Sequence, residues 1–231
     1  MKVQVDFLDL GAGHGGSYKI AKHKFGGKVG LCIDKNPERV KLLKDAGYVA
    51  ACLPIQQLDK LQGTVRFSMA CHVLEHLPSY EDVYTALKTA CKKSREFVYV
   101  EGPSFDFDDY LEQKGTKFYW RDGCGHKTRV TTSFLQACAA SLKLPYSLLI
   151  EKPLLNSTDS QDIIPLDAAS NSYCEALNSM CDLYIKEGAK PRKPLCPPIY
   201  RSFVYVLWVG KPCKQVLKAR PKFYPYAGYG A

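Results

Sequence analysis

Three glycines on alternate positions follow an acidic residue near the start of this chain. Residues 5–16 read VDFLDLGAGHGG, so an apolar run ends at Asp9 and leads into Gly11, Gly13 and Gly15. Glycine tolerates positive φ and has no Cβ, which lets a turn of this kind bring its backbone close to a ligand. The helix expected next would direct its N-terminus toward that ligand. We therefore expect a site for a nucleotide-type cofactor here.

A second acidic residue lies about twenty residues further on. Residues 28–34 (KVGLCID) predict a buried parallel strand that ends in Asp34. A carboxylate at this place can accept hydrogen bonds from the ribose hydroxyls of a cofactor. The alternative is that Asp34 caps the helix beginning at Pro37, although Asn36 is better placed as N-cap. Ribose contact alone does not distinguish one nucleotide cofactor from another.

The glycine segment also satisfies G-x-G-x-x-G, which leaves NAD and FAD as alternatives. However, residues 9–15 (DLGAGHG) resemble the first motif of class I S-adenosylmethionine (SAM)-dependent methyltransferases. The resemblance implies SAM as cofactor and S-adenosylhomocysteine (SAH) as product. It assigns cofactor contacts to Asp9, Gly11, Ala12, Gly13, Gly15, Asp34, Lys35, Leu53, Cys71 and His72. Leu53 is included because the adenine contact follows the third strand, where most relatives carry an acid.

Residues 67–78 (FSMACHVLEHLP) form a second motif, which contains His72, Glu75 and His76 in the H-x-x-E-H spacing of inverted zinc proteases. That chemistry needs both histidines inside a long helix, and Pro78 ends any helix here. We therefore expect no metal site. The segment is similar instead to the fourth-strand segment of ubiquinone-biosynthesis-like (type 11/23) methyltransferases. The resemblance places His72 beside the SAM sulfonium, as a general base or as a structural histidine.

The loop expected at 102–130 contains the residues that the resemblance places around an acceptor. Its GHKTRVT segment resembles one that lines the acceptor pocket of relatives, with His126 as the preferred general base. Arg129 would bind an acidic group or cap the loop. Acids and aromatic side chains suit hydroxyl groups and sugar faces. The predicted acceptor-binding residues are Asp106, Asp108, Tyr119, Trp120 and Arg129.

The favoured substrate is a small acceptor, with a sugar or glycan hydroxyl as the leading class, because small glycan O-methyltransferases share this short architecture. The same loop would also suit an amine or a diol chelated to a metal by Asp106 or Asp108, or it would be exposed with no role in a pocket. The competing prediction is a tRNA or rRNA methyltransferase. Residues 186–222 hold ten Lys or Arg and one acid, and residues 223–230 (FYPYAGYG) could stack on bases. A non-catalytic SAM-binding scaffold is the third alternative.

The alternation of apolar segments predicts an α/β fold with a doubly wound, Rossmann-like, mostly parallel sheet. Strands are expected at 3–10, 28–34, 47–51, 65–71, 96–101, 147–152 and 202–209, and helices at 17–25, 37–46, 55–62, 80–93 and 132–142. The resemblance implies seven strands, one of them antiparallel near the C-terminus. We expect a methyltransferase domain at 1–210 with an insert at 153–200, and a basic, aromatic tail at 211–231. The insert is expected to begin at the edge of the sheet opposite the site.

Length and composition limit the class of protein and its cellular location. The chain has 231 residues, of which 46% are hydrophobic, and this suits one domain with a substantial core. No apolar run is long enough for a membrane span, and no signal peptide is evident. Ten cysteines without a C-x-x-C pair indicate free thiols in a reducing compartment. We therefore expect a cytoplasmic protein, or one domain of a larger protein, without a helical lid before the first strand.

Overall fold

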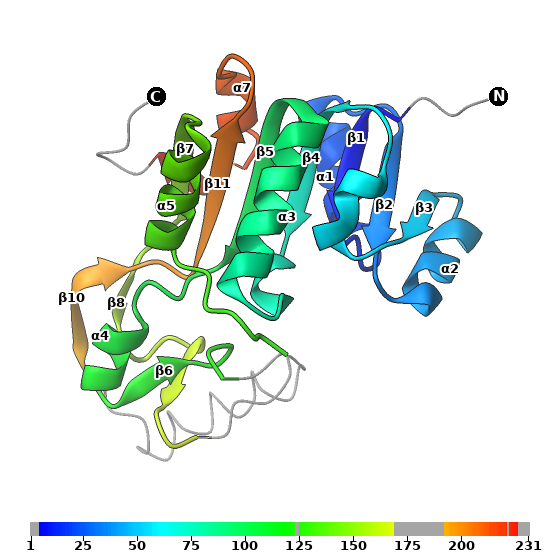
Figure 1. Cartoon of the computed structure of the whole chain (residues 1–231). Coiled ribbons are helices and arrows are strands. Elements are labelled where there is room, and N and C mark those ends of the chain that lie inside the picture. Colours follow the sequence, from blue (N-terminus) through cyan, green and yellow to red (C-terminus); the bar gives the residue numbers. More distant parts are fainter. Residues whose placement is uncertain (1–4, 123–124, 169–191, 221, 226–231) are drawn as a thin grey trace.

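The computed structural model describes residues 5–122, 125–168, 192–220 and 222–225 (Figure 1). At its centre is an eight-stranded sheet with the order β12-β7-β11-β5-β4-β1-β2-β3. Its strands are β1 (Phe7–Leu10), β2 (Gly30–Asp34), β3 (Val49–Cys52), β4 (Val65–Cys71), β5 (Ser94–Pro103), β7 (Tyr146–Glu151), β11 (Ser202–Trp208) and β12 (Phe223–Pro225). Neighbours among β1 to β5 pair in parallel, whereas β11 is antiparallel to both β5 and β7.

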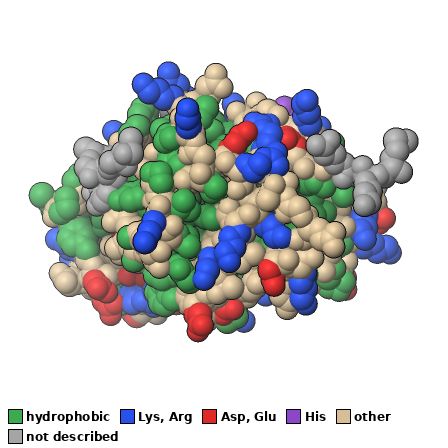
Figure 2. Space-filling model, turned by 45° about the horizontal axis from the view of Figure 1, so that its top comes forward, with side chains coloured by type: hydrophobic (Ala, Val, Ile, Leu, Met, Phe, Trp, Pro, Cys, Tyr) green, Lys and Arg blue, Asp and Glu red, His purple; other side chains and the backbone are tan. Residues whose placement is uncertain are grey.

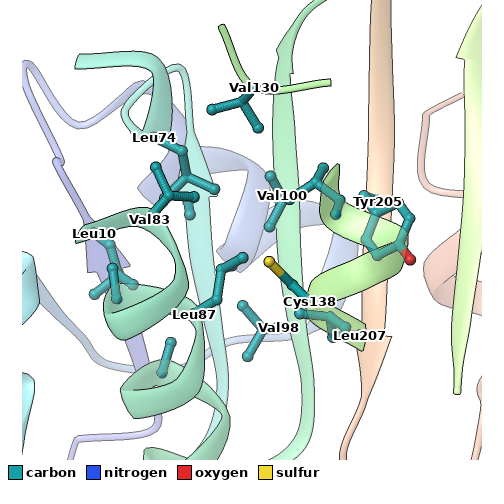
Figure 3. Close-up of a cluster of buried hydrophobic side chains, with 14 of the residues drawn as sticks. Leu10, Leu74, Val83, Leu87, Val98, Val100, Val130, Cys138, Tyr205 and Leu207 are labelled. Carbon is teal, nitrogen blue, oxygen red and sulfur yellow. The ribbon is translucent and has the colours of Figure 1, made fainter. Parts of the chain in front are cut away.

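Helices cover both faces of this sheet. They are α1 (Gly16–Phe25), α2 (Pro37–Asp45), the 3-10 helix η1 (Ile55–Lys60), α3 (Tyr80–Lys93), α5 (Thr132–Leu142) and α7 (Lys214–Leu217). The main core lies under η1, α3 and α5, where side chains such as Leu87 and Val98 meet (Figure 3). A second core contains Phe25 of α1 and Val216 of α7, packed against Phe67 and Tyr99 on the other face.

The local sequence explains where α3 begins and which of its faces packs against the sheet. The Ser79 hydroxyl accepts a hydrogen bond from the Asp82 backbone N–H at 3.1 Å, which satisfies one of the free amides of the first turn. Val83, Leu87 and Ala90 recur at helical spacing and are buried, so they form the face that packs on the sheet. The last turn carries two lysines, which suit the negative end of the helix dipole.

The mostly parallel sheet and its helices agree with the sequence prediction, but the strand count was wrong. The sheet has eight strands because β12, from the predicted tail at 211–231, adds to the free edge of β7. Both β11 and β12 therefore run against the remaining strands, where one antiparallel strand was expected. Helix α4 (Asp108–Gln113) lies in the segment that was expected to be a loop, and the 3-10 helix η2 (Leu74–His76) lies between β4 and α3, where no element was expected.

The insert begins at the same edge of the sheet as the glycine loop, so the expectation of the opposite edge was wrong. The reason is the direction of β7: it is antiparallel to β11, which is antiparallel to β5, so β7 runs parallel to β5. The insert contains β8 (Leu155–Ser157), β9 (Ile163–Pro165) and β10 (Pro194–Ile199). Strand β9 pairs with β6 (Thr116–Phe118) of the loop that follows β5, and β10 pairs with β8.

We call the unit formed by residues 104–122, 155–168 and 194–199 the small lobe. It has its own apolar cluster, in which Phe105, Leu111 and Phe118 pack with Ile163 and Leu195. Figure 1 shows it below the carboxyl ends of the parallel strands. In the described part of the chain, none of the helices is both long and apolar enough to cross a membrane.

Candidate active site

A cavity of about 750 Å³ opens at the carboxyl ends of β1, β2, β4 and β5; we call it the first cavity. The structure brings most of the predicted cofactor residues together in its wall. These are Gly11, Ala12, Gly13, Asp34, Lys35, Cys71 and His72. Residues from four strand ends and the glycine turn thus surround one space, as expected for a doubly wound fold.

The glycine turn requires glycine at its first position. Gly11 has φ +65°, and a Cβ built there would lie 2.2 Å from the Cγ2 atom of Val73. Gly15 has φ +80° and forms the N-cap of α1, where a Cβ would meet the ring of Tyr48 at 3.3 Å. Gly15 does not line the cavity; its role is to let the chain turn into α1.

Asp9 is completely buried under the turn and does not line the cavity either. Its Oδ1 atom accepts a hydrogen bond from the Ser17 hydroxyl at 2.5 Å, which ties the end of β1 to the first turn of α1. Burial raises the pKa of Asp9 to about 6, and its Oδ2 atom has no hydrogen-bond partner among the described residues. Asp9 therefore organises the turn rather than lining the cavity.

Asp34 connects the turn to the next strand. Its Oδ2 atom accepts a hydrogen bond from the Gly13 backbone N–H at 3.1 Å, and its Oδ1 atom accepts one from the Asn36 N–H at 2.9 Å. The N-cap of α2 is Asn36, whose side chain accepts from the Glu38 N–H at 2.8 Å, so the helix cap does not depend on the Asp34 side chain. Asp34 is left at the cavity wall, where a ligand can reach it.

A second cavity of about 580 Å³ adjoins the first, and His72 and His76 line both. The predicted residues Tyr119, Trp120 and His126 also line the second cavity. Its other lining residues are Glu75, Pro103, Glu151, Asp162, Arg201 and Ser202. Arg201 pairs with Glu151 at 3.0 Å and with Asp162 at 3.1 Å, so these two acids share one guanidinium within the wall.

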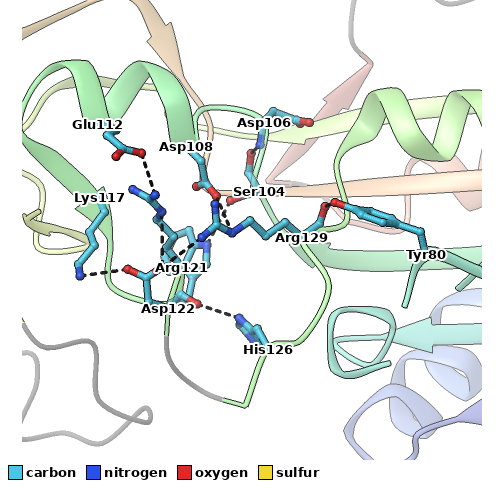
Figure 4. Close-up of polar contacts among 11 residues, drawn as sticks. Tyr80, Ser104, Asp106, Asp108, Glu112, Lys117, Arg121, Asp122, His126 and Arg129 are labelled. Atoms are coloured by element: carbon cyan, nitrogen blue, oxygen red, sulfur yellow. Dashed lines mark hydrogen bonds and ion pairs between the residues drawn. The ribbon is translucent and has the colours of Figure 1, made fainter. Parts of the chain in front are cut away.

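Three predicted acceptor residues lie outside both cavities and hold the loop together instead (Figure 4). Asp106 accepts a hydrogen bond from the Thr132 N–H at 2.7 Å and one from the Tyr200 hydroxyl at 2.5 Å. Arg129 lies 3.6 Å from the carboxylate of Asp108, which is buried. Burial raises the pKa of Asp108 to about 6.

Histidines gather where the two cavities meet. The rings of His76 and His126 are 4.9 Å apart, and the Nδ1 atom of His126 lies 2.9 Å from the Trp120 carbonyl oxygen. Burial lowers the pKa of His126, so its ring is neutral at neutral pH. His72 adopts φ +50°, and Glu75, whose carboxylate lies 3.7 Å from its Nδ1 atom, raises its pKa.

No protein-family model and no curated protein matches this sequence, whereas solved structures match it well. A SAM-dependent methyltransferase from Archaeoglobus fulgidus is 17% identical, with a TM-score of 0.58 over 90% of this chain and 87% of that one. Magnesium protoporphyrin IX methyltransferase from Synechocystis, solved with bound SAM, is 8% identical, with a TM-score of 0.50 over 89% and 70%. The plantazolicin methyltransferase BamL is 11% identical, with a TM-score of 0.51 over 89% and 77%. The chain has the fold of SAM-dependent methyltransferases.

Sequence reasoning on this methyltransferase fold missed several lining residues. Leu53 packs against the main core, and Ile55 and Gln56 of η1 line the first cavity in its place. Glu101 and Arg220 also line it, and they form an ion pair with each other. The acid at the end of β5 was a usable signal, but nothing in the basic C-terminal segment singled out Arg220.

Proposed function

We propose that the protein is a SAM-dependent methyltransferase that binds SAM in the first cavity and an acceptor in the second. The observation that carries this proposal is that the two cavities meet at His72 and His76. A methyl group held at that junction could pass in line from one ligand to the other, which is how positioning accelerates a displacement. The bound SAM named for the Synechocystis structure supports the choice of cofactor.

The carboxylate of Asp34 would accept hydrogen bonds from the ribose hydroxyls of SAM. It already holds the Gly13 amide, so the ribose and the glycine turn would share one acid. Lys35 and Gln56 lie in the same wall. The positive sulfonium would face the junction, where the Glu101 carboxylate lies close to the Arg220 guanidinium. This arrangement gives the cofactor a polar end and leaves its methyl group facing the second cavity.

The acceptor is proposed to be a hydroxyl of a small molecule, with a sugar or glycan as the favoured class. Tyr119 and Trp120 offer aromatic faces for a sugar ring, and Glu75 offers carboxylate oxygens for its hydroxyls. The methyltransferases named above differ in what their names say they act on, so the acceptor has to be inferred from the cavity itself.

An RNA acceptor is less well supported. A carboxylate in the acceptor cavity would repel a phosphate backbone, and Arg201 is already paired with two acids. Figure 2 shows the Lys and Arg side chains of one face in several separate groups rather than in one continuous patch.

None of the seven described cysteines forms a disulfide, which supports the proposed cytoplasmic location.

The proton of the acceptor hydroxyl would pass to a histidine of the junction. The oxygen would form its bond to the methyl carbon while the sulfur–carbon bond breaks, leaving SAH as a neutral thioether. His126 and His72 both border the second cavity and are the two residues proposed for this role. His126 is held in one tautomer, because its Nδ1 atom faces a carbonyl oxygen that can only accept a hydrogen bond.

The direct test is to measure SAH release with glycosides, phenols and total RNA as acceptors. We expect turnover on a glycoside or a phenol that is lost on heating the protein. Turnover on RNA alone would contradict the acceptor assignment and give the basic C-terminal segment a substrate-binding role. Tight SAM binding without turnover on any acceptor would favour the scaffold alternative.

A further inference from the structure

We infer that Glu75, His76 and His126 bind one divalent cation in the wall of the second cavity. The three side chains each offer one ligand atom, and these atoms all lie within 4.8 Å of one another. Two of the residues belong to η2, which is separated from the end of β4 by two residues, and the third lies in the segment that leads into α5. All three line the second cavity, so a cation held by them would face the acceptor.

The carboxylate of Glu75 is the strongest indication of a missing positive partner. Glu75 is only 3% exposed, and its Oε1 atom has no hydrogen-bond partner among the described residues. The imidazole of His72 forms an ion pair with this oxygen only when its ring is protonated, and their separation of 3.7 Å is longer than a hydrogen bond. A buried carboxylate oxygen without a partner is costly, and a cation in the cluster would remove that cost.

Both histidines have one ring nitrogen fixed by a backbone carbonyl oxygen. The Nδ1 atom of His76 lies 3.1 Å from the carbonyl oxygen of Gly125, and that of His126 lies 2.9 Å from the carbonyl oxygen of Trp120. A carbonyl oxygen only accepts hydrogen bonds, so each Nδ1 carries the proton and each Nε2 keeps a free lone pair. Metal-binding histidines commonly have their second nitrogen fixed in this way.

The ligand set favours a particular class of cation. Two imidazoles and one carboxylate suit Zn²⁺, Co²⁺ or a similar transition-metal ion better than Mg²⁺ or Ca²⁺, which prefer oxygen ligands alone. Zinc bonds of about 2.0–2.1 Å place tetrahedral ligands about 3.4 Å apart, so ligand atoms that lie up to 4.8 Å apart would move closer by at most about 1.4 Å on binding. Three protein ligands leave a coordination position open, as in catalytic rather than structural sites.

This site differs from the zinc-protease arrangement that the sequence motif first suggested. Residues 74–76 form a short 3-10 turn, and Leu77 has extended backbone angles, so His72 and His76 do not share a long helix. The third ligand instead comes from His126, which lies fifty residues further along the chain. The positive φ of His72 turns the chain out of β4 and into η2, which carries Glu75 and His76.

The role of the cation rests on the proposed function. The acceptor hydroxyl would occupy the open coordination position, and the cation would lower the pKa of that hydroxyl. With His126 bound to the cation, the hydroxyl proton would pass to His72, which lines both cavities. The oxygen would then form its bond to the methyl carbon as the sulfur–carbon bond breaks and the electron pair stays on sulfur.

The test uses Co²⁺ as the probe on the full chain after treatment with a chelator. We expect one Co²⁺ per chain, with visible absorption bands typical of nitrogen and oxygen ligands. Glu75→Gln and His126→Gln should each weaken Co²⁺ binding by about 10-fold or more, while SAM affinity, measured on the same samples, stays the same. His23→Gln, an exposed histidine on α1, is the matched control and should leave Co²⁺ affinity unchanged.

Three results would overturn the cation site: no Co²⁺ binding, equal affinity in all variants, or thiolate absorption bands that assign the ion to exposed cysteines such as Cys52. If Glu75→Gln does not fold, His126→Gln decides the question, since its side chain is less deeply buried. Absence of SAM binding alongside normal Co²⁺ binding would overturn the proposed function and leave the cation site standing.

Discussion

The guanidinium of Arg220 forms an ion pair with the carboxylate of Glu101, although the two residues are 119 positions apart in the chain. Glu101 lies near the end of β5 and also accepts a hydrogen bond from the Tyr99 hydroxyl at 2.8 Å. Both members of the ion pair line the first cavity. The C-terminal segment, with α7 and β12, is therefore part of the wall of the proposed cofactor site rather than a detached tail.

Arg220→Ala should destabilise the protein by about 1–2 kcal/mol, because it leaves the nearly buried Glu101 carboxylate without its cation. Urea unfolding monitored by circular dichroism measures this change. Lys218→Ala, an exposed residue of the same segment, is the control and should change stability by less than about 0.5 kcal/mol. Adding Glu101→Gln to Arg220→Ala should recover part of the loss; a double variant less stable than both single variants would contradict the pairing.

Gly11→Ala should cost about 2 kcal/mol more than Gly26→Ala. Both glycines have φ +65°, so both substitutions carry the same left-handed strain of about 1–2 kcal/mol. At Gly11 the new Cβ would overlap the side chain of Val73, whereas at Gly26 no atom of the described residues lies within 4 Å. Thermal unfolding of the two variants measures the difference. Val73→Ala should restore part of the stability of Gly11→Ala, and equal losses at the two glycines would refute the packing argument.

The unfolding free energy should fall with rising pH because of Asp9. Burial raises the pKa of Asp9 from 3.8 to about 6 in the folded protein, so the folded state binds more protons than the unfolded state between these values. This group alone should lower stability by roughly 1–2 kcal/mol from pH 5 to pH 8. Asp9→Asn should lose this part of the pH dependence, whereas Asp59→Asn, at an exposed position, should keep it. Parallel pH profiles for wild type and Asp9→Asn would show that the folded-state pKa is not raised.

His126→Ala should lower turnover by about 100-fold while SAM affinity stays unchanged, whether its lone pair accepts a proton or binds a cation. The reason is its position: it lines the second cavity and not the first. Steady-state kinetics and calorimetry on the same preparation separate the two effects. His23→Ala should retain wild-type turnover. A loss of less than about 3-fold in His126→Ala would move the role to His72.

Much of the sheet could be predicted because its strands are continuous apolar runs with acids or glycines at their ends. Residues 202–208 (SFVYVLW) show this, and the structure places them as β11 between β5 and β7. The eighth strand could not be predicted in this way. Strand β12 is three residues long, two of its residues are exposed, and it exists only because the edge of β7 offers free backbone groups.

The candidate site could be predicted where local motifs define it and not where distant segments meet. Gly11 and Asp34 follow from strand ends and spacing, so the sequence was enough. Asp106 was expected to reach an acceptor, but it accepts hydrogen bonds from the Thr132 amide and the Tyr200 hydroxyl, and Tyr200 is the last residue of the insert. The sequence around a carboxylate in an aromatic loop is the same whether the carboxylate binds an acceptor or holds the loop together. Only its tertiary contacts distinguish these two roles.

The most direct test of the central proposal is a calorimetric titration of the protein with SAM, repeated on Asp34→Ala. The account predicts one SAM per chain, and binding about 10- to 100-fold weaker in Asp34→Ala because charge-assisted hydrogen bonds to the ribose are lost. Asp59→Ala, an exposed acid on η1, should bind SAM like the wild type. No binding to the wild type, or equal affinity in Asp34→Ala, would contradict the assignment of the first cavity as the SAM site.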